Sequence, residues 1–190
     1  MCLRQGTGLS EKAGTSSDSG VSLLELLAVL AIISIMAAIA LPDLSRFASK
    51  KILSHQAEKM ADIIHRARDL AMEQGHSWRV SFSPGQGTWM CYCDEDGDSE
   101  IDPGERKLGP YMLEKGIRFG CLAGSGPNNS SVPADGVSFV DDRISFSPMG
   151  SCNAGSIYLC DRERSIAIRV LPASGVVRMW QYRNAWEELK

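Results

Sequence analysis

A continuous apolar segment with one carboxylate near its start constrains this chain more than any other feature. Over residues 21–41 the only polar side chains are Ser22, Glu25 and Ser34. About 20 apolar residues in a helix are enough to cross the hydrocarbon core of a bilayer. A lone acid at the edge of such a segment is energetically costly, and it is usually retained because it has a function. The pattern predicts a membrane-spanning helix over 21–42 in which Glu25 has a special role.

The residues before this segment have a different composition. They are rich in Gly and Ser, show no hydrophobic periodicity and end in Gly20. Their charged side chains cancel one another and are Arg4, Lys12, Glu11 and Asp18. We therefore predict that residues 1–20 form a leader that stays in the cytoplasm.

A second helical pattern follows the apolar segment. Apolar residues recur there at alternating spacings of four and three, with charged residues between them; they are Leu53, Ala57, Met60, Ile64, Ala67 and Ala71. This spacing places one apolar stripe on an otherwise polar helix. Gly75 is a natural position for such a helix to stop. The pattern predicts an amphipathic helix over 43–75 that packs on a folded domain.

Beyond residue 75 the pattern changes to the alternation typical of strands. Trp78, Val80 and Phe82 alternate with polar residues, and a turn at 83–87 leads into a second strand at 88–93, which together predict a hairpin. Further short strands are predicted at 117–121, 137–140, 144–147, 156–159, 166–170 and 176–180, and a loop at 124–136. The predicted fold class is α+β, with one long N-terminal helix packed on an antiparallel β-domain of residues 76–190.

Several of these segments together resemble one protein family. Gly20-Val-Ser-Leu-Leu-Glu25 and the apolar run after it resemble the class III signal of type IV pilins and type II secretion pseudopilins. Further along, the chain is similar to GspH/FimT-type pseudopilins in four motifs that keep the family order: Arg66-Ala-Arg-Asp-Leu-Ala71, Phe146-Ser-Pro-Met-Gly150, Leu159-Cys-Asp161 and Gly175-Val-Val-Arg178. The resemblance covers most of residues 20–180 and implies a pilin-like fold.

The resemblance also implies a structural subunit and not an enzyme. In this family an inner-membrane prepilin peptidase cuts after the residue equivalent to Gly20 and methylates the new N-terminus, here Val21. The residue equivalent to Glu25 then pairs with the α-amine of a neighbouring subunit during assembly. The implied partners are other pseudopilins or pilins, the peptidase and the inner-membrane assembly platform.

The implied location is the bacterial inner membrane, with a single span and the C-terminal domain in the periplasm. Assembly would then lead into either the pseudopilus of a type II secretion system or a type IV pilus. The sequence does not separate these two machines. It also carries no Gly-x-Ser-x-Gly, P-loop or His-Glu-x-x-His motif that would indicate catalysis.

An acidic stretch between two predicted strands resembles a calcium-binding loop. The spacing of its acids matches positions 1, 3, 5, 9 and 12 of an EF-hand loop, and these acids are Asp94, Asp96, Asp98, Asp102 and Glu105. Position 6 is Ser99, where an EF-hand has Gly. The sequence leaves two interpretations open, a Ca²⁺ site and a solvated acidic hairpin loop.

The cysteines have a further set of alternatives. Cys2 falls in the predicted leader, and five cysteines remain in the exported part, at 91, 93, 121, 152 and 160. An exported domain can form disulfides, but spacing alone does not give their connectivity. The pair Cys152–Cys160 is the favoured hypothesis, because 153–156 reads as a turn between them. The alternative is a zinc site built from Cys91, Cys93, Cys152 and Cys160.

Two other classes of function compete with the structural one. Some FimT-type minor pilins bind DNA through a basic stretch near the C-terminus, and the corresponding position here is Arg178, with Trp180, Tyr182 and Trp186 nearby for stacking. The net charge of −3 gives no overall basic field for such a partner. In the other alternative, a signal peptidase cuts after Ala40 and releases a soluble calcium-binding domain.

Overall fold

The computed structural model describes residues 22–189, except for the side chains of residues 39–50. The chain divides into two compact units, one that ends at Ser45 and one that begins at Arg46. Helix α1 (Leu23–Gln74) contributes residues to both units. The predicted leader, Gly20 and Val21 lie outside the described residues.

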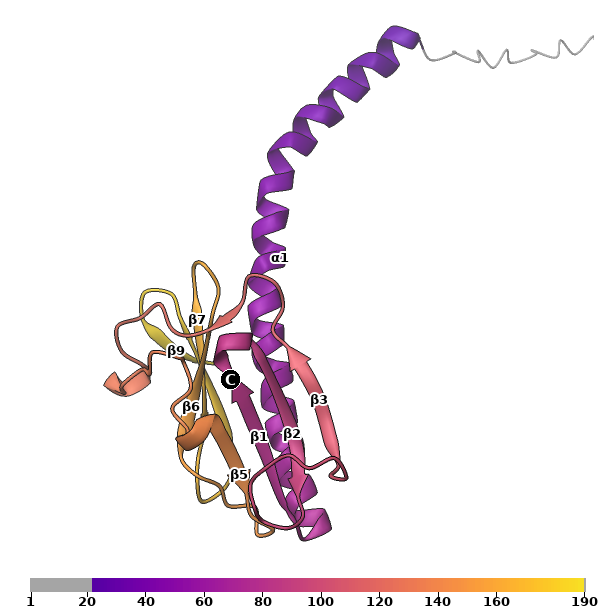
Figure 1. The fold of residues 1–190 in the computed structure, drawn as a ribbon. Coiled ribbons are helices and arrows are strands. Elements are labelled where there is room, and N and C mark those ends of the chain that lie inside the picture. Colours follow the sequence, from indigo (N-terminus) through magenta and orange to yellow (C-terminus); the bar gives the residue numbers. More distant parts are fainter. Residues whose placement is uncertain (1–21, 190) are drawn as a thin grey trace, which may run out of the picture. The chain divides into compact units, whose positions relative to one another are not determined.

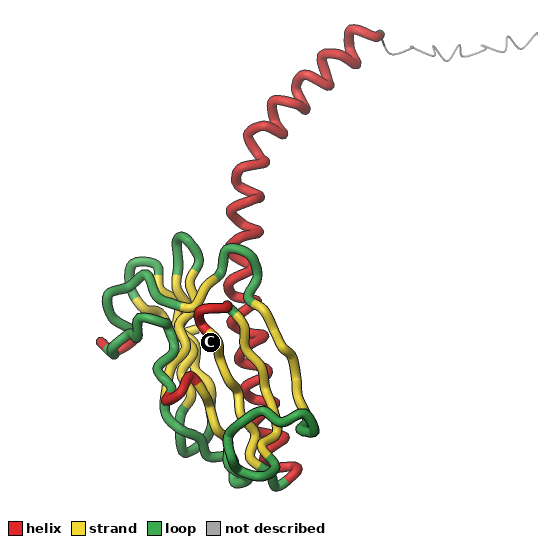
Figure 2. Tube along the Cα trace, in the orientation of Figure 1, coloured by secondary structure: helices red, strands yellow, loops and turns green. Residues whose placement is uncertain are grey.

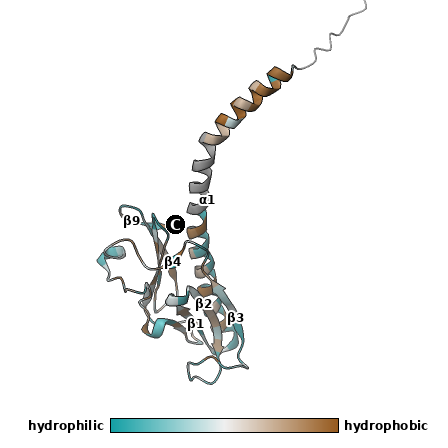
Figure 3. Ribbon diagram, turned by 45° about the horizontal axis from the view of Figure 1, so that its top comes forward, coloured by the Kyte–Doolittle hydropathy of each residue, from teal (hydrophilic) through white to brown (hydrophobic). Residues whose placement is uncertain are grey.

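The first unit contains the beginning of α1. The amide of Leu26 donates to the carbonyl of Ser22 at 3.1 Å, and the amide of Leu24 approaches the Ser22 hydroxyl at 3.4 Å. Ser22 is therefore the N-cap residue, which satisfies amides that lack a partner within the helix. The first part of α1 is coloured as hydrophobic over most of its surface in Figure 3.

In the second unit the predicted stripe of α1 is buried. All six of its predicted members are 0–1% exposed: Leu53, Ala57, Met60, Ile64, Ala67 and Ala71. The helix ends at Gln74, and Gly75 follows with φ of 69° while its amide donates to the carbonyl of Ala71 at 3.1 Å. This positive φ favours glycine, so the prediction of a helix stop at Gly75 is confirmed.

The first sheet is antiparallel and has the strand order β3-β2-β1-β5 (Figure 1). Its strands are β1 (Ser77–Ser83), β2 (Thr88–Asp94), β3 (Lys107–Met112) and β5 (Arg143–Phe146). The predicted hairpin is present as β1 and β2, joined through the short 3-10 helix η1 (Pro84–Gln86). Val80 lies opposite Cys91 on one side and Ile144 on the other, and all three are fully buried.

The second sheet is also antiparallel and has the order β4-β6-β7-β8-β9. Figure 2 draws the strands of both sheets in yellow. Its strands are β4 (Arg118–Phe119), β6 (Gly155–Cys160), β7 (Ser165–Val170), β8 (Val177–Tyr182) and β9 (Trp186–Leu189). Ile157 lies opposite Ile168, and Leu159 lies opposite Ile166. These four side chains are fully buried and form the inner face of this sheet.

One cluster of buried side chains joins the stripe of α1 to the inner faces of both sheets. Met60 and Ile64 of the helix belong to the same cluster as Trp78 of the first sheet and Ile168 of the second. The domain core is therefore a single layer of apolar contacts shared by three elements, which is the arrangement expected of an α+β fold. The predicted fold class is confirmed.

One predicted strand is absent, and two strands of the structure were not predicted. Residues 137–140 make only an isolated bridge, from Val137 to Ile157, and lead into the 3-10 helix η3 (Val140–Asp142). Strands β3 and β9 were missed because neither has an alternating apolar pattern. Strand β3 contains Gly109 and Pro110, and three of the four residues of β9 are exposed. These two strands form at sheet edges, where pairing with a neighbouring strand outweighs weak local preference.

The edge of β6 is shared by two short segments that come very close together. The amide of Tyr158 donates to the carbonyl of Gly136 at 2.8 Å, while its carbonyl accepts from the amide of Gly120 at 2.9 Å. A Cβ atom on Gly136 would lie 2.2 Å from the backbone nitrogen of Gly120. Gly136 also has φ of 84°, so a side chain there meets both steric overlap and backbone strain.

We predict that Gly136→Ala lowers the free energy of unfolding by about 2–4 kcal/mol, because backbone atoms on both sides have to move. Gly104→Ala is the matched control, since a Cβ atom at Gly104 meets nothing within 4 Å. Urea unfolding followed by tryptophan fluorescence measures both variants. Equal midpoints for the two variants would contradict the proposed role of the close approach.

Candidate functional site

The beginning of α1 carries the first candidate site. Glu25 is exposed and lies in the first turn of the helix, where a negative charge interacts favourably with the unpaired amides of the helix N-terminus. Its predicted partners in processing, Gly20 and Val21, lie outside the described residues. The structure therefore gives the position of the acid and leaves the cleavage site as a prediction.

The apolar side chains around Glu25 are exposed on every side of the helix. Ten large apolar side chains in this part of α1 are 47–76% exposed: Leu23, Leu24, Leu26, Leu27, Val29, Leu30, Ile32, Ile33, Ile35 and Met36. Ser34, the one hydroxyl among them, donates to the carbonyl of Leu30 at 2.7 Å and so is satisfied within the helix. A helix that is apolar all round is stable only in an apolar environment.

Over the residues whose side chains are described, no helix has the length and hydropathy required to cross a membrane. Residues 39–41 of the predicted span are outside that set.

The acidic loop between β2 and β3 is the second candidate site. Its first acid, Asp94, is buried at the end of β2 and forms an ion pair with Arg79 of β1. The other oxygen of Asp94 accepts from the amide of Gly97 at 2.9 Å. Arg79 in turn donates to the hydroxyl of Ser145 at 2.8 Å. Because a buried charge is stable only when it is paired, this network ties the start of the loop to three strands of the first sheet.

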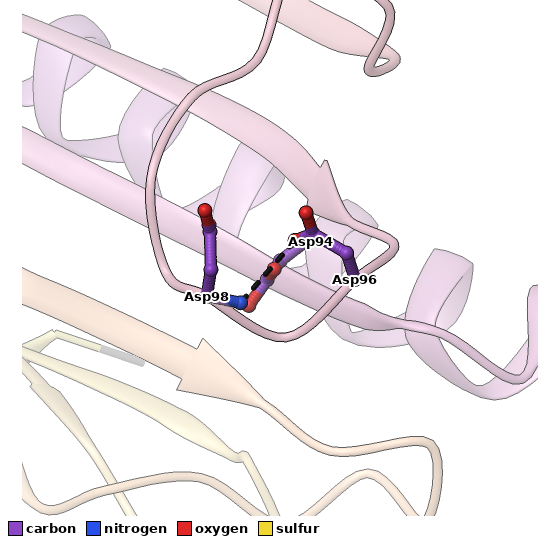
Figure 4. A group of neighbouring side chains, drawn as sticks. All are labelled: Asp94, Asp96 and Asp98. Carbon is purple, nitrogen blue, oxygen red and sulfur yellow. Dashed lines mark hydrogen bonds between the residues drawn. The ribbon is translucent and has the colours of Figure 1, made fainter.

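The next two acids bring their carboxylates close to that of Asp94. The carboxylates of Asp94, Asp96 and Asp98 offer oxygen atoms within 4.8 Å of one another (Figure 4). The amide of Asp98 donates to Asp96 at 3.2 Å, and the amide of Glu100 donates to Asp98 at 2.7 Å. These local turns curl the loop so that the side chains of alternate residues converge.

Two sets of hydrogen bonds hold the loop in this curled conformation, one at Ser99 and one at Glu105. Ser99 adopts φ of 73°, which is the conformation that Gly supplies at this position of an EF-hand, and its carbonyl accepts hydrogen bonds from Tyr92 at 3.0 Å and from Arg143. Glu105 accepts from the amides of Glu95 and Asp102, both at 3.1 Å. The flanking elements are strands, and yet the loop has the sharp turn that a calcium loop requires.

The fourth predicted ligand lies in the same electrostatic environment. Desolvation in the folded loop, and then the neighbouring carboxylates of Asp98 and Asp96, raise the pKa of Asp102 above its usual value. A bound cation would relieve this repulsion, and carboxylate oxygens are the ligands that Ca²⁺ prefers. However, Glu105 already uses both of its oxygens on backbone amides. Calcium binding therefore stays a prediction, with Asp96, Asp98 and Asp102 as the most available ligands.

The DNA-binding candidate has fewer free groups than its sequence indicates. Arg178 on β8 is exposed but forms an ion pair with Glu188 of β9 at 3.7 Å. Arg169 lies over the ring of Trp180 at 5.4 Å, and Trp186 donates to the carbonyl of Ser125 at 2.8 Å. Since these aromatic rings already have partners within the domain, DNA binding through Arg178 stays a prediction without support from this arrangement.

The disulfide Cys152–Cys160 stays a prediction, and the strand between the two cysteines does not favour it. Cys91, Cys93, Cys121, Cys152 and Cys160 are all free thiols in the structure. Residues 155–160 are not part of a turn but form β6, whose five steps span about 16 Å at 3.3 Å per residue. The two cysteines therefore do not flank a tight turn, which was the reason for favouring this pair.

Sequence reasoning missed one polar contact that connects three of the family-like motifs. Arg68 of α1 donates to the carbonyl of Gly150 at 3.2 Å. A Cβ atom on Gly175 would lie 2.4 Å from the Cδ atom of Arg68, and one on Gly150 would lie 2.7 Å from the sulfur of Met72. Both glycines have positive φ values, 78° and 62°, which favour glycine at these positions. These glycines allow two loops to close over the last turns of α1.

Comparison with known proteins agrees with this geometry. The sequence signature described as Type II transport protein GspH matches residues 56–174, which is more than half of the chain. The chain belongs to the GspH family. A second signature, the prokaryotic N-terminal methylation motif, matches residues 15–41 and so includes Gly20, Val21 and Glu25. No curated protein matches the chain.

Solved structures with a similar fold come from two bacteria. The type IV minor pilin FimU of Pseudomonas aeruginosa is 11% identical with a TM-score of 0.51, and the match covers 74% of this chain and 96% of FimU. The minor pseudopilin EpsH from the type 2 secretion system of Vibrio cholerae is 9% identical with a TM-score of 0.45, and the match covers 67% of this chain and 95% of EpsH. The likeness to FimU supports the pilin-like fold. As a member of the GspH family, the chain is a structural subunit of the minor pseudopilin and minor pilin class.

We predict that Ca²⁺ at about 10 mM raises the Tm of the full chain by about 3–10 °C, as expected for a site with a Kd of about 0.1–1 mM. Asp98→Asn should abolish most of this shift because it removes one converging carboxylate. Glu100→Gln is the matched control, since Glu100 is an exposed acid of the same loop outside the cluster. Differential scanning calorimetry with and without chelator gives the answer, and an unchanged Tm in the wild-type chain would leave the acidic hairpin interpretation.

Proposed function

We propose that the chain is made as a precursor, cut between Gly20 and Val21 by a prepilin peptidase, methylated on Val21, and assembled into a pseudopilus of a type II secretion system. The observation that carries this proposal is the N-terminal part of α1, which is apolar on every side and has one acid in its first turn. The methylation motif over residues 15–41 and the GspH family match support the same conclusion.

The apolar surface of this helix has two favourable environments. Before assembly, a segment of about 20 residues that begins near Val21 is long enough to reside in the bilayer, with the domain on the periplasmic side. After assembly, the same side chains pack against equivalent helices in the filament core. Keeping one Leu or Ile side chain away from water contributes about 1.5–3 kcal/mol, so both environments stabilise a segment with ten exposed large apolar side chains. Because lipid tails are as apolar as these side chains, the step from bilayer to bundle is driven by van der Waals packing between helices.

Glu25 supplies the specificity of that assembly. Cleavage creates a positive α-amine on Val21, four residues before the carboxylate. In an apolar bundle an unpaired charge costs several kcal/mol, whereas an amine and a carboxylate from neighbouring subunits neutralise each other. The register in which each Glu25 meets a neighbour's Val21 amine is therefore strongly favoured over other registers. This role is structural, and the chain serves as the substrate of the peptidase.

The type IV pilus is the alternative machine, because FimU is a type IV minor pilin. The assembly step is chemically the same in both machines. Co-purification with the partner subunits of each machine, expressed together with this chain, separates the two assignments. Recovery only with pilus subunits would overturn the secretion assignment and leave the maturation steps unchanged.

We predict that co-expression with a prepilin peptidase converts the membrane-extracted chain to a mature form that begins with N-methylated Val21. Intact mass and N-terminal sequencing measure this directly. A terminus at Leu41 would instead indicate signal-peptidase release of a soluble domain. An uncut chain in the presence of active peptidase would contradict the proposed maturation.

We predict that Glu25→Gln leaves cleavage intact and reduces the filament-associated fraction of the subunit by at least about tenfold, because a neutral side chain cannot compensate a buried amine. Glu73→Gln is the matched control, since it removes one exposed acid from the same helix. Cross-linking of the sheared filament fraction measures assembly. Normal incorporation of the Glu25→Gln subunit would show that the carboxylate is not required.

A further inference from the structure

The outer face of the second sheet is covered by a segment of the chain that we call the covering loop, residues 121–130. Its beginning is held by the amide of Leu122, which donates to the hydroxyl of Ser165 at 2.8 Å. In its middle, the carbonyl of Ser125 accepts a hydrogen bond from the indole N–H of Trp186, at 2.8 Å. Its end is held where Arg169 donates to the hydroxyl of Ser130 at 2.9 Å. The loop is therefore fixed on the sheet at three places.

Cys160 lies beneath the beginning of this loop. It is the last residue of β6, and the strand alternates so that Ile157 and Leu159 belong to the core while Tyr158 and Cys160 point to the outer face. Cys160 is nevertheless 0% exposed. A thiol on the outer face of a sheet is buried only when another segment lies over it, and the covering loop is the segment that starts there.

The position of Cys121 is bounded by its two neighbours. A Cβ atom on Gly120 would lie 3.8 Å from the sulfur of Cys160. On the other side, Leu122 bonds to Ser165, which is the residue directly opposite Cys160 in the pairing of β6 with β7. Because consecutive Cα atoms are about 3.8 Å apart, Cys121 passes close to Cys160.

The other described cysteines have no comparable arrangement. Cys91 and Cys93 lie two residues apart on β2 and are fully buried in the core, and two such positions on one strand are poorly placed to bridge each other. Burial, and then the nearby Cys93, raises the pKa of Cys91 to about 12. The thiol of Cys152 instead points to the carbonyl of Leu171, at 3.8 Å.

We propose that Cys121 and Cys160 form a disulfide that fastens the covering loop to the second sheet. The proposal rests on the proposed function, because the bond requires the oxidising compartment that an exported domain enters. The oxidant is a disulfide of a thiol-disulfide oxidoreductase or of glutathione.

The reaction balances as two successive exchanges. The half-buried Cys121 thiolate attacks the oxidant, whose sulfur–sulfur bond breaks and releases one thiolate. The Cys160 thiolate then attacks the sulfur of Cys121 and releases the second thiolate. Two electrons pass to the oxidant, and its two thiolates take up the two protons. Burial raises the pKa of Cys160, while Arg118 opposes that rise. Cys121 is the better first nucleophile because its half-buried thiol can be reached by the oxidant, whereas Cys160 is buried.

Peptide mapping of the full chain tests the pairing. Trypsin releases peptide 119–143 with Cys121 as its only cysteine, and peptide 144–162 with both Cys152 and Cys160. The chain is purified in detergent under reducing conditions, oxidised with glutathione disulfide, alkylated and digested. We expect the two peptides to be linked in the wild-type chain and in Cys152→Ser, and unlinked in Cys160→Ser. A link that persists in Cys160→Ser, or free thiols in every sample, would overturn the proposal.

Thermal unfolding provides a second measurement. The bond would close a loop of about 40 residues, so reduction should lower the Tm of the oxidised wild-type chain by roughly 5–15 °C. Cys160→Ser should show no such shift, and its Tm should match that of the reduced wild-type chain if the substitution leaves the fold intact. An equal shift in both chains would contradict the pairing.

The same mapping on the chain exported in cells separates this proposal from the proposed function. A linked pair in a chain that begins at Val21 supports both. Free Cys121 and Cys160 in a chain that begins at Val21 would overturn the disulfide and leave the proposed function standing. In a third outcome, the two cysteines pair in the purified chain, while in cells they stay reduced and the chain stays uncut. That outcome would overturn export and, with it, the disulfide.

Discussion

The contact on which the folded domain depends is the packing of the buried stripe of α1 against both sheets. Each sheet has only one apolar face, and an amphipathic helix of this kind gains little stability without a partner. Leu53, Met60 and Ile64 are completely buried in that contact. Because each such side chain contributes about 1.5–3 kcal/mol, the stripe links the stability of the two sheets. If the helix were displaced, the apolar side chains on the inner face of each sheet would be exposed to water.

The outer faces of the two sheets are completed in different ways. The first sheet uses charge: Asp94 is buried against Arg79, and the acidic loop begins from that pair. The second sheet uses aromatic rings and the covering loop, where Tyr158 and Trp186 meet edge to face. In both arrangements polar groups on the outer face have partners within the domain.

The beginning of α1 differs from the domain in this respect. Its apolar side chains have no covering element among the described residues of its own unit, and Glu25 has a charge that neither lipid nor an apolar bundle can solvate. Lipid before assembly, and equivalent helices after it, supply the apolar environment that such a segment needs in the proposed filament subunit. The family assignment and the chemistry of the N-terminal segment therefore support the same function by separate routes.

The sequence by itself determined the features that depend on local periodicity. The apolar segment, the acid at Glu25, the stripe of α1 and the hairpin of β1 and β2 are all readable because neighbours in sequence are neighbours on the same face. Even the acidic loop could be predicted, because the spacing of its acidic residues is visible in a short stretch of sequence. The family, too, follows from such short motifs in their order along the chain.

Only the tertiary structure decided the features that depend on residues far apart in sequence. Strands β3 and β9 exist because an open sheet edge was available to pair with, and not because of their own composition. The contacts of Arg68 with the loops at Gly150 and Gly175, and the approach of the segment at Cys121 to Cys160, arise in the same way. The choice among five cysteines was therefore beyond the sequence, because a disulfide depends on distance in space and an extended strand can separate cysteines that are close in the chain.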